Sequence, residues 1–152
     1  MSISTYNKKR DFKQTSEPKG EVKSKKDKEL IFVIHDHHAS HHHYDLRLEH
    51  EGVLKSWAVP KEPPMDDKTK RLAMEVEDHP YSYKDFEGTI PEGNYGAGTV
   101  KIWDNGTYVP EKFSDKEIII DFKGKKLKGK YVLIKTNFGK SKNAWLWFKK
   151  KI

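Results

Sequence analysis

The 152-residue sequence consists largely of short runs rich in β-branched and aromatic residues, separated by segments rich in Gly, Pro, Asn and Asp. Such runs favour strands, and the intervening segments, for example PKEPPMDD, EGTIPEGNYGAG and DNG, are typical of turns. The candidate strands are Ile31–His35, His43–Glu49, Val53–Val59, Arg71–Glu77, Thr99–Trp103, Glu117–Phe122, Lys130–Thr136 and Ala144–Lys149. Because no window carries a long apolar stripe of helical period, this pattern predicts an all-β barrel or sandwich.

The first 29 residues differ from the rest of the chain. They are mostly polar and include the Lys-rich stretch KGEVKSKKDKE, which indicates a polar N-terminal tail or linker. Residues 30–152 are long enough for one domain. With 34% hydrophobic and 35% charged residues, that domain is expected to have a small core and a heavily charged surface.

Several protein classes are excluded by what the sequence lacks. Without cysteine, the chain has no disulfides, thiolate nucleophiles or Cys-ligated metal centres. It has no apolar run near the roughly 18 residues of a membrane span and no secretory signal at the N-terminus. We therefore expect a cytoplasmic protein with no membrane association. The sequence also lacks a GxGxxG fingerprint, a complete P-loop and the GxSxG of serine hydrolases.

Charge is unevenly distributed along the chain. Residues 31–110 carry eight Lys and Arg against fourteen Asp and Glu, whereas the segments on both sides carry a net positive charge. An acidic middle can hold a cation, and basic flanks can hold a polyanion such as nucleic acid.

Seven of the eight histidines lie in HDHHASHHHYDLRLEH, residues 35–50. In a strand, His43, Asp45 and Arg47 share one face at about 6.5 to 7 Å between successive Cα atoms, so His43 and Asp45 can converge on one cation. A helix would turn them about 200° apart. Spacing alone leaves the third ligand open among the five preceding histidines, which are His35, His37, His38, His41 and His42. The longest histidine run is three and interior, which argues against a purification tag.

A second alternating strand, RLAMEVE, carries the polar residues Arg71, Glu75 and Glu77 on one face. His79 joins that face if the extended chain continues to Pro80, as the residue before proline favours. The guanidinium fork of arginine matches phosphate in a bidentate way. Arginine is scarce here, and the three are Arg10, Arg47 and Arg71.

Two other functions fit part of this pattern. His43, Asp45 and His79 on a β fold could form the facial triad of a non-haem iron oxygenase, although no arginine follows Arg71 to bind an oxoglutarate co-substrate. A non-catalytic nucleic-acid-binding barrel would leave the histidines as bystanders. Trp145 and Trp147, which alternate near the C-terminus, are expected to pack in the barrel and not to stack on bases.

A close resemblance to a known family lies in two long segments, FVIHDHHASHHHYDLRLEHEGVLKSWAVPKEPP and KRLAMEVEDHPYSYKDFEGTIPEGNYGAGTVKIWDNGTY. Its blocks LKSWAVPK, VEDHP and DFEGTIPEGNYGAG are too long for chance similarity. The resemblance begins at KRDFKQTSEP, continues through LKGKYVLIKT and WLWFKK, and covers nearly the whole chain. The chain resembles the 3′-phosphoesterase domain of bacterial DNA ligase D and its stand-alone archaeal and bacterial relatives.

The resemblance implies a single small β-barrel of about eight strands with short flanking helical or irregular segments. It implies a hydrolase that acts on DNA or mixed RNA/DNA 3′ ends during non-homologous end joining, a form of DNA repair. Such enzymes remove a 3′-terminal ribonucleoside and then hydrolyse the remaining 3′-phosphate to a 3′-hydroxyl. Manganese is the usual metal, with Co²⁺ or Zn²⁺ as substitutes.

Site residues also follow from the resemblance. The family pattern places a histidine six residues before HxDxR, which selects His37 as the ligand that joins His43 and Asp45. Phosphate contacts fall on Arg47 and His79. Other active-site positions match Lys61, Arg71, Glu77 and Tyr83, and a substrate-binding motif in the N-terminal tail matches Arg10, Asp11 and Glu17.

Two features depart from the family pattern. The surplus histidines at positions 35, 38, 41 and 42 blur the ligand register. No polymerase or ligase domain accompanies this sequence, so a separate ligase, polymerase or Ku-like protein is expected to act in trans.

Overall fold

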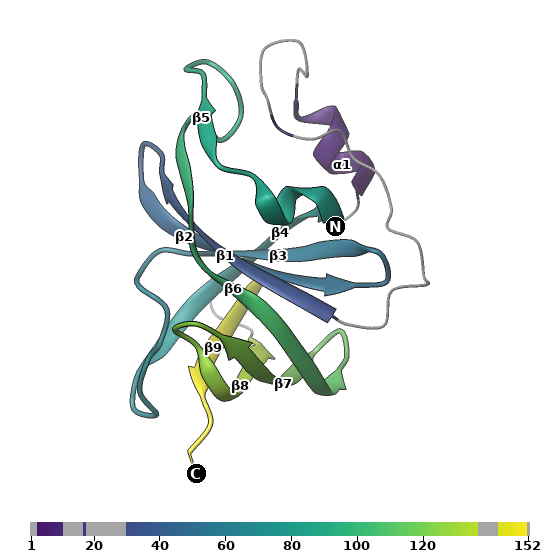
Figure 1. The fold of residues 1–152 in the computed structure, drawn as a ribbon, viewed down its shortest axis with the longest axis vertical. Helices are drawn as coiled ribbons and strands as arrows, with labels where there is room; N and C mark the ends of the chain where they lie inside the picture. The colour runs from purple at the N-terminus through teal and green to yellow at the C-terminus, as the bar shows by residue number, and fades with distance from the viewer. Residues whose placement is uncertain (1–2, 11–16, 18–29, 137–142, 152) are drawn as a thin grey trace.

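The computed structural model of the chain describes residues 3–10, 17, 30–136 and 143–151 (Figure 1). Two helical segments lie within these residues, the α-helix α1 (Ile3–Lys8) and the 3₁₀ helix η1 (Tyr81–Asp85). The strands are β1 (Leu30–His38), β2 (His42–His50), β3 (Val53–Val59), β4 (Lys70–Pro80), β5 (Gly88–Ile90), β6 (Gly98–Phe113), β7 (Glu117–Gly124), β8 (Lys128–Lys135) and β9 (Ala144–Lys149). Among the described residues, no helix has the length and hydrophobicity that crossing a bilayer would require.

Eight of the strands close into an antiparallel barrel in the order β1-β2-β3-β4-β9-β8-β7-β6, and β6 pairs back onto β1. The short strand β5 lies outside this ring and pairs with the beginning of β6. The predicted all-β barrel is therefore confirmed. Closure leaves each barrel strand paired on both sides along part of its length, which removes the exposed edges of an open sheet.

The barrel interior is filled by alternate residues of each strand. On β2 these are Leu46 and Leu48, which are fully buried and belong to one cluster with Trp57 of β3. Trp145 and Trp147 of β9 are 2% and 0% exposed in the same cluster, so the predicted core packing of these tryptophans is confirmed. Burial of each large apolar side chain contributes about 1.5 to 3 kcal/mol to stability.

A second, smaller apolar cluster covers the outer face of β1 and β3. Tyr6 of α1, Tyr83 of η1 and Ile90 of β5 pack there against Val33 and Leu54. In Figure 1, α1, η1 and β5 lie together over one end of the barrel. Near that end, β1 and β3 are therefore covered on both faces, so polar side chains on their outer face lie away from solvent.

The strand β4 does not keep one polar face. Its pairing with β3 shifts register, with Val76 opposite Ser56 but His79 opposite Leu54, so one extra residue of β4 lies between these pairs. Such a bulge moves the following side chains to the other face. The prediction that Arg71 and His79 share one face is therefore wrong.

The strand β6 extends through the predicted turn DNG, residues 104–106. Asp104 accepts backbone hydrogen bonds from Lys125, Lys126 and Leu127, so this carboxylate organises the turn between β7 and β8. Gly106 allows a close approach of β7, because a Cβ at this position would lie 2.3 Å from the Lys123 carbonyl oxygen. These turn-favouring residues thus serve a neighbouring turn and a strand contact instead of ending the strand.

Candidate metal and phosphate site

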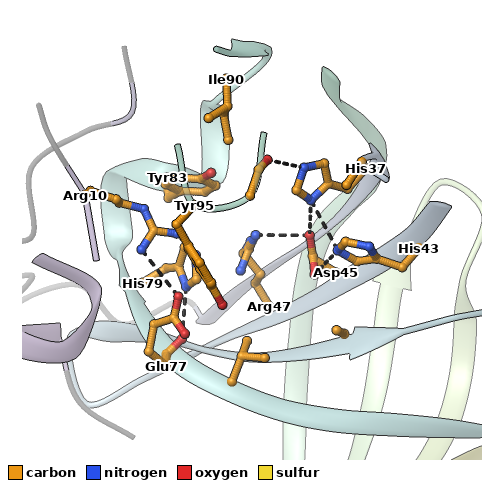
Figure 2. A pocket seen from close by; sticks show the side chains of 14 residues that line it. Arg10, His37, His43, Asp45, Arg47, Glu77, His79, Tyr83, Ile90 and Tyr95 are labelled. Atoms are coloured by element: carbon orange, nitrogen blue, oxygen red, sulfur yellow. Dashed lines mark hydrogen bonds and ion pairs between the residues drawn. The ribbon is translucent and has the colours of Figure 1, made fainter. Parts of the chain in front are cut away.

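A pocket of about 270 Å³ opens on the outer face of β1, β2 and β3, beneath the loop that joins β5 to β6 (Figure 2). Strands β1 and β2 supply the imidazoles and the carboxylate, β4 supplies His79, and the end of α1 leads to Arg10. The polar side chains that line the pocket are Arg10, His37, His43, Asp45, Arg47, Glu77, His79, Tyr83 and Tyr95.

Three ligand atoms meet at one end of this pocket. Because His37 is the cross-strand partner of His43, and Asp45 follows two residues along β2, all three side chains point to the same side of the sheet. His37 Nδ1 lies 3.2 Å from His43 Nε2 and 3.4 Å from Asp45 Oδ2, and His43 Nε2 lies 3.2 Å from Asp45 Oδ1. Ligand atoms at about 2.0 to 2.2 Å from one first-row ion have separations of this size.

The other ring nitrogens of the two histidines are held by backbone carbonyls. His37 Nε2 donates to the Gly96 carbonyl oxygen at 2.7 Å, and His43 Nδ1 donates to the His41 carbonyl oxygen at 3.0 Å. The ring nitrogens that face Asp45, His37 Nδ1 and His43 Nε2, are therefore the ones that would bind a metal, and the backbone carbonyls orient both rings for it. Gly96 has φ +77°, which glycine adopts without strain, so the loop can bring its carbonyl onto His37.

Asp45 is ready to act as an anionic ligand. Burial alone would raise its pKa, but the charge of Arg47 and hydrogen bonds with His37 and His43 outweigh burial and hold the pKa well below its usual value. Burial also lowers the pKa of His43, yet the hydrogen bond and charge of Asp45 raise it overall. The residues present thus fit a divalent cation, which would replace the protons that the cluster attracts.

Arg47 stands beside this cluster and is only 3% exposed. Its Nη2 lies 3.4 Å from Asp45 Oδ2, and its Nε donates to His35 Nδ1 at 3.1 Å. The remaining nitrogen, Nη1, is buried and has no hydrogen-bond partner in the described part of the chain. A buried donor without a partner costs about 1 to 3 kcal/mol, so this atom is a strong candidate for contact with an anionic ligand.

His35 positions Arg47, a role that sequence reasoning missed. It is fully buried, accepts from Arg47 at Nδ1 and donates from Nε2 to the Phe86 carbonyl oxygen at 3.0 Å. Burial, followed by the charge of Arg47, lowers its pKa to about 3. This imidazole therefore stays neutral at physiological pH. This role follows from the pairing of His35 opposite Asp45 on the neighbouring strand, which spacing along one strand does not reveal.

His79 lies at the opposite end of the pocket and is 3% exposed. Its Nδ1 donates to the Glu77 carbonyl oxygen at 3.0 Å, and its Nε2 accepts from Arg10 Nη2 at 3.2 Å. Burial, then the charges of Arg47 and Arg10, lowers the pKa of His79 well below its usual value. The ring is thus a neutral acceptor between two guanidinium groups.

Arg10 reaches the pocket from the N-terminal segment. Its Nε pairs with Glu17 at 2.9 Å and its Nη1 pairs with Glu77 at 3.3 Å, with both carboxylates almost fully buried. Tyr83 donates to the same Glu17 oxygen at 2.6 Å, and its ring lies 4.8 Å from the Arg47 guanidinium carbon. Tyr6, Arg10 and Glu17 of the predicted tail are therefore packed onto the barrel, and Arg10 lines the pocket.

Not every predicted site residue reaches the pocket. Lys61 is exposed, and Arg71 donates to the Glu62 carbonyl oxygen at 2.7 Å, so neither lines it. Asp11 lies outside the described residues. Sequence reasoning also missed Lys9 and Tyr95, which lie close together at the pocket rim.

The iron-oxygenase alternative required His79 as the third ligand. In the described residues, the group of mutually close ligand atoms contains His37 together with His43 and Asp45, and it does not include His79. The nitrogen of His79 that could bind a metal is instead hydrogen-bonded to Arg10. The geometry thus favours His37 as the third ligand and His79 as part of an anion site.

Known proteins are similar to this chain over most of its length. Residues 35–135 match the family described as the DNA ligase D 3′-phosphoesterase domain. The multifunctional non-homologous end joining protein LigD of Pseudomonas aeruginosa is 46% identical over 155 aligned residues, covering 98% of this chain and 18% of that protein. The LigD of Mycobacterium bovis, with the same description, is 48% identical over 139 residues, covering 89% of this chain and 18% of that protein.

The match covers most of this chain but only a small part of each relative. The chain spans about a fifth of the length of the curated relatives that it matches. The family match over residues 35–135 includes His37, His43 and Asp45 of the cluster, and also His79. The chain belongs to the family of DNA ligase D 3′-phosphoesterase domains.

Proposed function

We propose that this protein is a metal-dependent phosphoesterase that heals DNA 3′ ends during repair. It would remove a 3′-terminal ribonucleoside and hydrolyse the remaining 3′-phosphate to a 3′-hydroxyl. The observation that carries the proposal is the buried Nη1 of Arg47, which has no hydrogen-bond partner among the described residues and lies beside three converging metal-ligand atoms. A phosphoryl group satisfies both features, because its oxygens can bind a cation and accept from a guanidinium at the same time.

Arg47 has the main role in binding the phosphoryl group. Its Nε and Nη2 are already held by His35 and Asp45, so the guanidinium is fixed before the substrate arrives. Nη1 would donate to a phosphoryl oxygen, and a charge-assisted hydrogen bond of this type contributes about 1.5 to 3 kcal/mol. Pre-organised donors of this kind stabilise charge without reorganising during the reaction.

The metal ion would be held by His37, His43 and Asp45. When bound, a divalent ion such as Mn²⁺ supplies Lewis-acid stabilisation of phosphoryl charge, with Co²⁺ or Zn²⁺ as substitutes. Two imidazoles and one carboxylate suit these borderline ions better than Mg²⁺ or Ca²⁺, which prefer all-oxygen ligands.

His79 and Arg10 would bind the phosphoryl group from the opposite side. In the free protein, His79 holds its proton at Nδ1, and burial together with the charges of Arg47 and Arg10 keeps the ring neutral. A phosphate dianion between the two guanidinium groups would offset those charges and raise the pKa of His79. The ring could then hold a second proton at Nε2 and donate it to the leaving oxygen.

The DNA strand would approach across the pocket rim. Tyr95 is 47% exposed there, and Lys9 Nζ lies 4.5 Å from the centre of its ring. An exposed aromatic ring beside a lysine offers stacking to a terminal base and charge to the backbone. Mixed RNA/DNA 3′ ends are the proposed substrates, and a separate ligase, polymerase or Ku-like protein would act on the healed end.

The test uses primer–templates that end in a 3′-ribonucleotide or a 3′-phosphate. Trimming should require Mn²⁺, Co²⁺ or Zn²⁺, should stop with a chelator, and should be lost in His43→Ala and Arg47→Ala. A shorter strand with a 3′-hydroxyl is the expected product. Unchanged activity in either variant would contradict the site assignment. Retained DNA binding with no end processing in any divalent metal would favour the non-catalytic barrel.

A further inference from the structure

A second group of possible metal ligands lies on the other face of the same hairpin. Asp36 and His38 alternate with His37 on β1, and His42 is the cross-strand partner of His38. Their side chains therefore point away from the phosphoesterase pocket. This placement accounts for two of the surplus histidines, because consecutive histidines on each strand serve opposite faces.

The ligand atoms of this outer cluster lie close together, as do those of the inner one. His38 Nε2 lies 3.3 Å from Asp36 Oδ1, and His42 Nε2 lies 2.5 Å from the same oxygen. The imidazole rings of His38 and His42 are stacked at 4.0 Å between centroids and only 7° from parallel, whereas the inner rings are tilted by 60°. Binding of an ion would therefore turn the exposed outer rings until both Nε2 atoms point at it. One ligand atom from each residue lies within 4.8 Å of the other two, as in the inner cluster.

The two clusters differ in exposure. The side chains of His38 and His42 are 57% and 44% exposed, and that of Asp36 is 25% exposed, whereas the inner carboxylate of Asp45 is buried. An ion held by the outer cluster would complete its coordination with water. Its affinity should be lower than that of the inner cluster, where backbone carbonyls orient both imidazoles.

We propose that Asp36, His38 and His42 bind a second divalent transition-metal ion of the Zn²⁺ class. Two imidazole nitrogens and one carboxylate oxygen favour Zn²⁺, Ni²⁺, Cu²⁺ or Co²⁺ over Mg²⁺ and Ca²⁺. The ion would link β1 to β2 directly beside the inner ligands. Asp36 and His38 flank His37 on β1, and His42 precedes His43 on β2. The outer cluster is a surface site and takes no part in the proposed phosphoesterase reaction, so it does not rest on that function.

Calorimetric titration with Zn²⁺ alone tests the proposal on the full chain. The unaltered protein should bind two ions, and Asp36→Asn and His42→Gln should each bind only one, with trimming of 3′ ends retained. His41→Gln is the matched control, because His41 is an exposed histidine in the same hairpin and belongs to neither cluster. It should still bind two ions. Binding of the remaining ion by Asp36→Asn and His42→Gln shows that these variants are folded.

A second measurement separates the two sites. In His43→Ala, which removes an inner ligand, added Zn²⁺ should still raise the midpoint of thermal unfolding, because an ion that binds only the folded state stabilises it. That shift should disappear in the double variant His43→Ala with His42→Gln. The proposal is overturned if the unaltered protein binds a single ion, or if Asp36→Asn and His42→Gln both keep the second ion. A shift that persists in the double variant would also overturn it.

Discussion

The two faces of β2 are both buried but have opposite chemistry. Leu46 and Leu48 enter the apolar barrel core, while Asp45 and Arg47, which alternate with them, enter the polar pocket. Apolar burial stabilises the fold directly. A buried carboxylate and guanidinium lose solvation that their mutual attraction only partly restores. The comparison indicates that the core-facing side of β2 contributes stability, whereas the pocket-facing side carries the charged groups that we propose for binding and chemistry.

The largest expected effect is on the apolar face. Leu46→Ala removes a fully buried side chain from the barrel core and should lower the free energy of unfolding by about 2 to 5 kcal/mol. Urea denaturation measures this loss. Activity per folded molecule, assayed below the new transition, should stay near that of the unaltered protein. A large loss of activity in a fully folded variant would break the separation between the two faces.

The next effect is on the polar face. Arg47→Lys keeps a positive charge near Asp45, but one ammonium group cannot reproduce the three directions of the guanidinium. We expect about a 100-fold loss of kcat, the size seen when one pre-organised donor is removed. The loss of unfolding free energy should be smaller than that of Leu46→Ala, because lysine keeps a positive charge beside the buried carboxylate of Asp45. Steady-state hydrolysis of a 3′-phosphate and urea denaturation provide the two readouts. A stability loss equal to that of Leu46→Ala, with normal turnover, would reverse the comparison.

A smaller effect is expected where the N-terminal segment meets the polar face. Arg10→Ala removes a guanidinium that is held by Glu17 and Glu77 and contacts His79. We predict about a tenfold loss of kcat/KM, equivalent to roughly 1.4 kcal/mol. Lys8→Ala is the matched control, because Lys8 is exposed in the same segment and does not line the pocket. Equal effects of the two substitutions would show that Arg10 acts only through general charge.

The smallest effect concerns pH. The unfolded chain protonates His35 as the pH falls below its ordinary pKa of 6.5, but folded His35 has a pKa of about 3. Its stabilising contribution is thus complete above pH 6.5 and decreases as the pH falls toward 3. In His35→Gln, the amide oxygen can accept from Arg47 and the amide nitrogen can donate to Phe86, without titration.

Stability between pH 7 and 5.5 should therefore fall less in His35→Gln than in the unaltered protein, by about 1 kcal/mol. His79 also has a lowered pKa, so part of the acid dependence should remain. Urea denaturation at several pH values measures the two slopes. Identical slopes would show that His35 is not held neutral by the fold.

Alternation in the sequence predicted the two faces of β2, because polar or charged residues alternate with Tyr44, Leu46 and Leu48 along this strand. His43, Asp45 and Arg47 therefore appear together on one side, as the spacing predicted. The choice of His37 came from the family resemblance. Its physical basis is the cross-strand pairing with His43, which spacing along one strand does not reveal.

The same reasoning failed where a strand departs from strict alternation. The register shift in β4 places His79 in the pocket but leaves Arg71 outside it, and a bulge has no clear signal in RLAMEVE. The turn-like DNG misled for another reason, since Asp104 caps the turn between β7 and β8, which lies about twenty residues further along the chain. Both errors come from tertiary pairing, which local composition does not contain.

The account depends on one divalent ion and one phosphoryl group sharing the polar face of β1 and β2. A crystal structure with Mn²⁺ and inorganic phosphate, with the ion located by its anomalous signal, tests this most directly. We predict Mn²⁺ bound by His37, His43 and Asp45, with a phosphate oxygen within hydrogen-bond distance of Arg47 Nη1. An ion that takes His79 in place of His37, or a phosphate bound away from Arg47, would contradict the account.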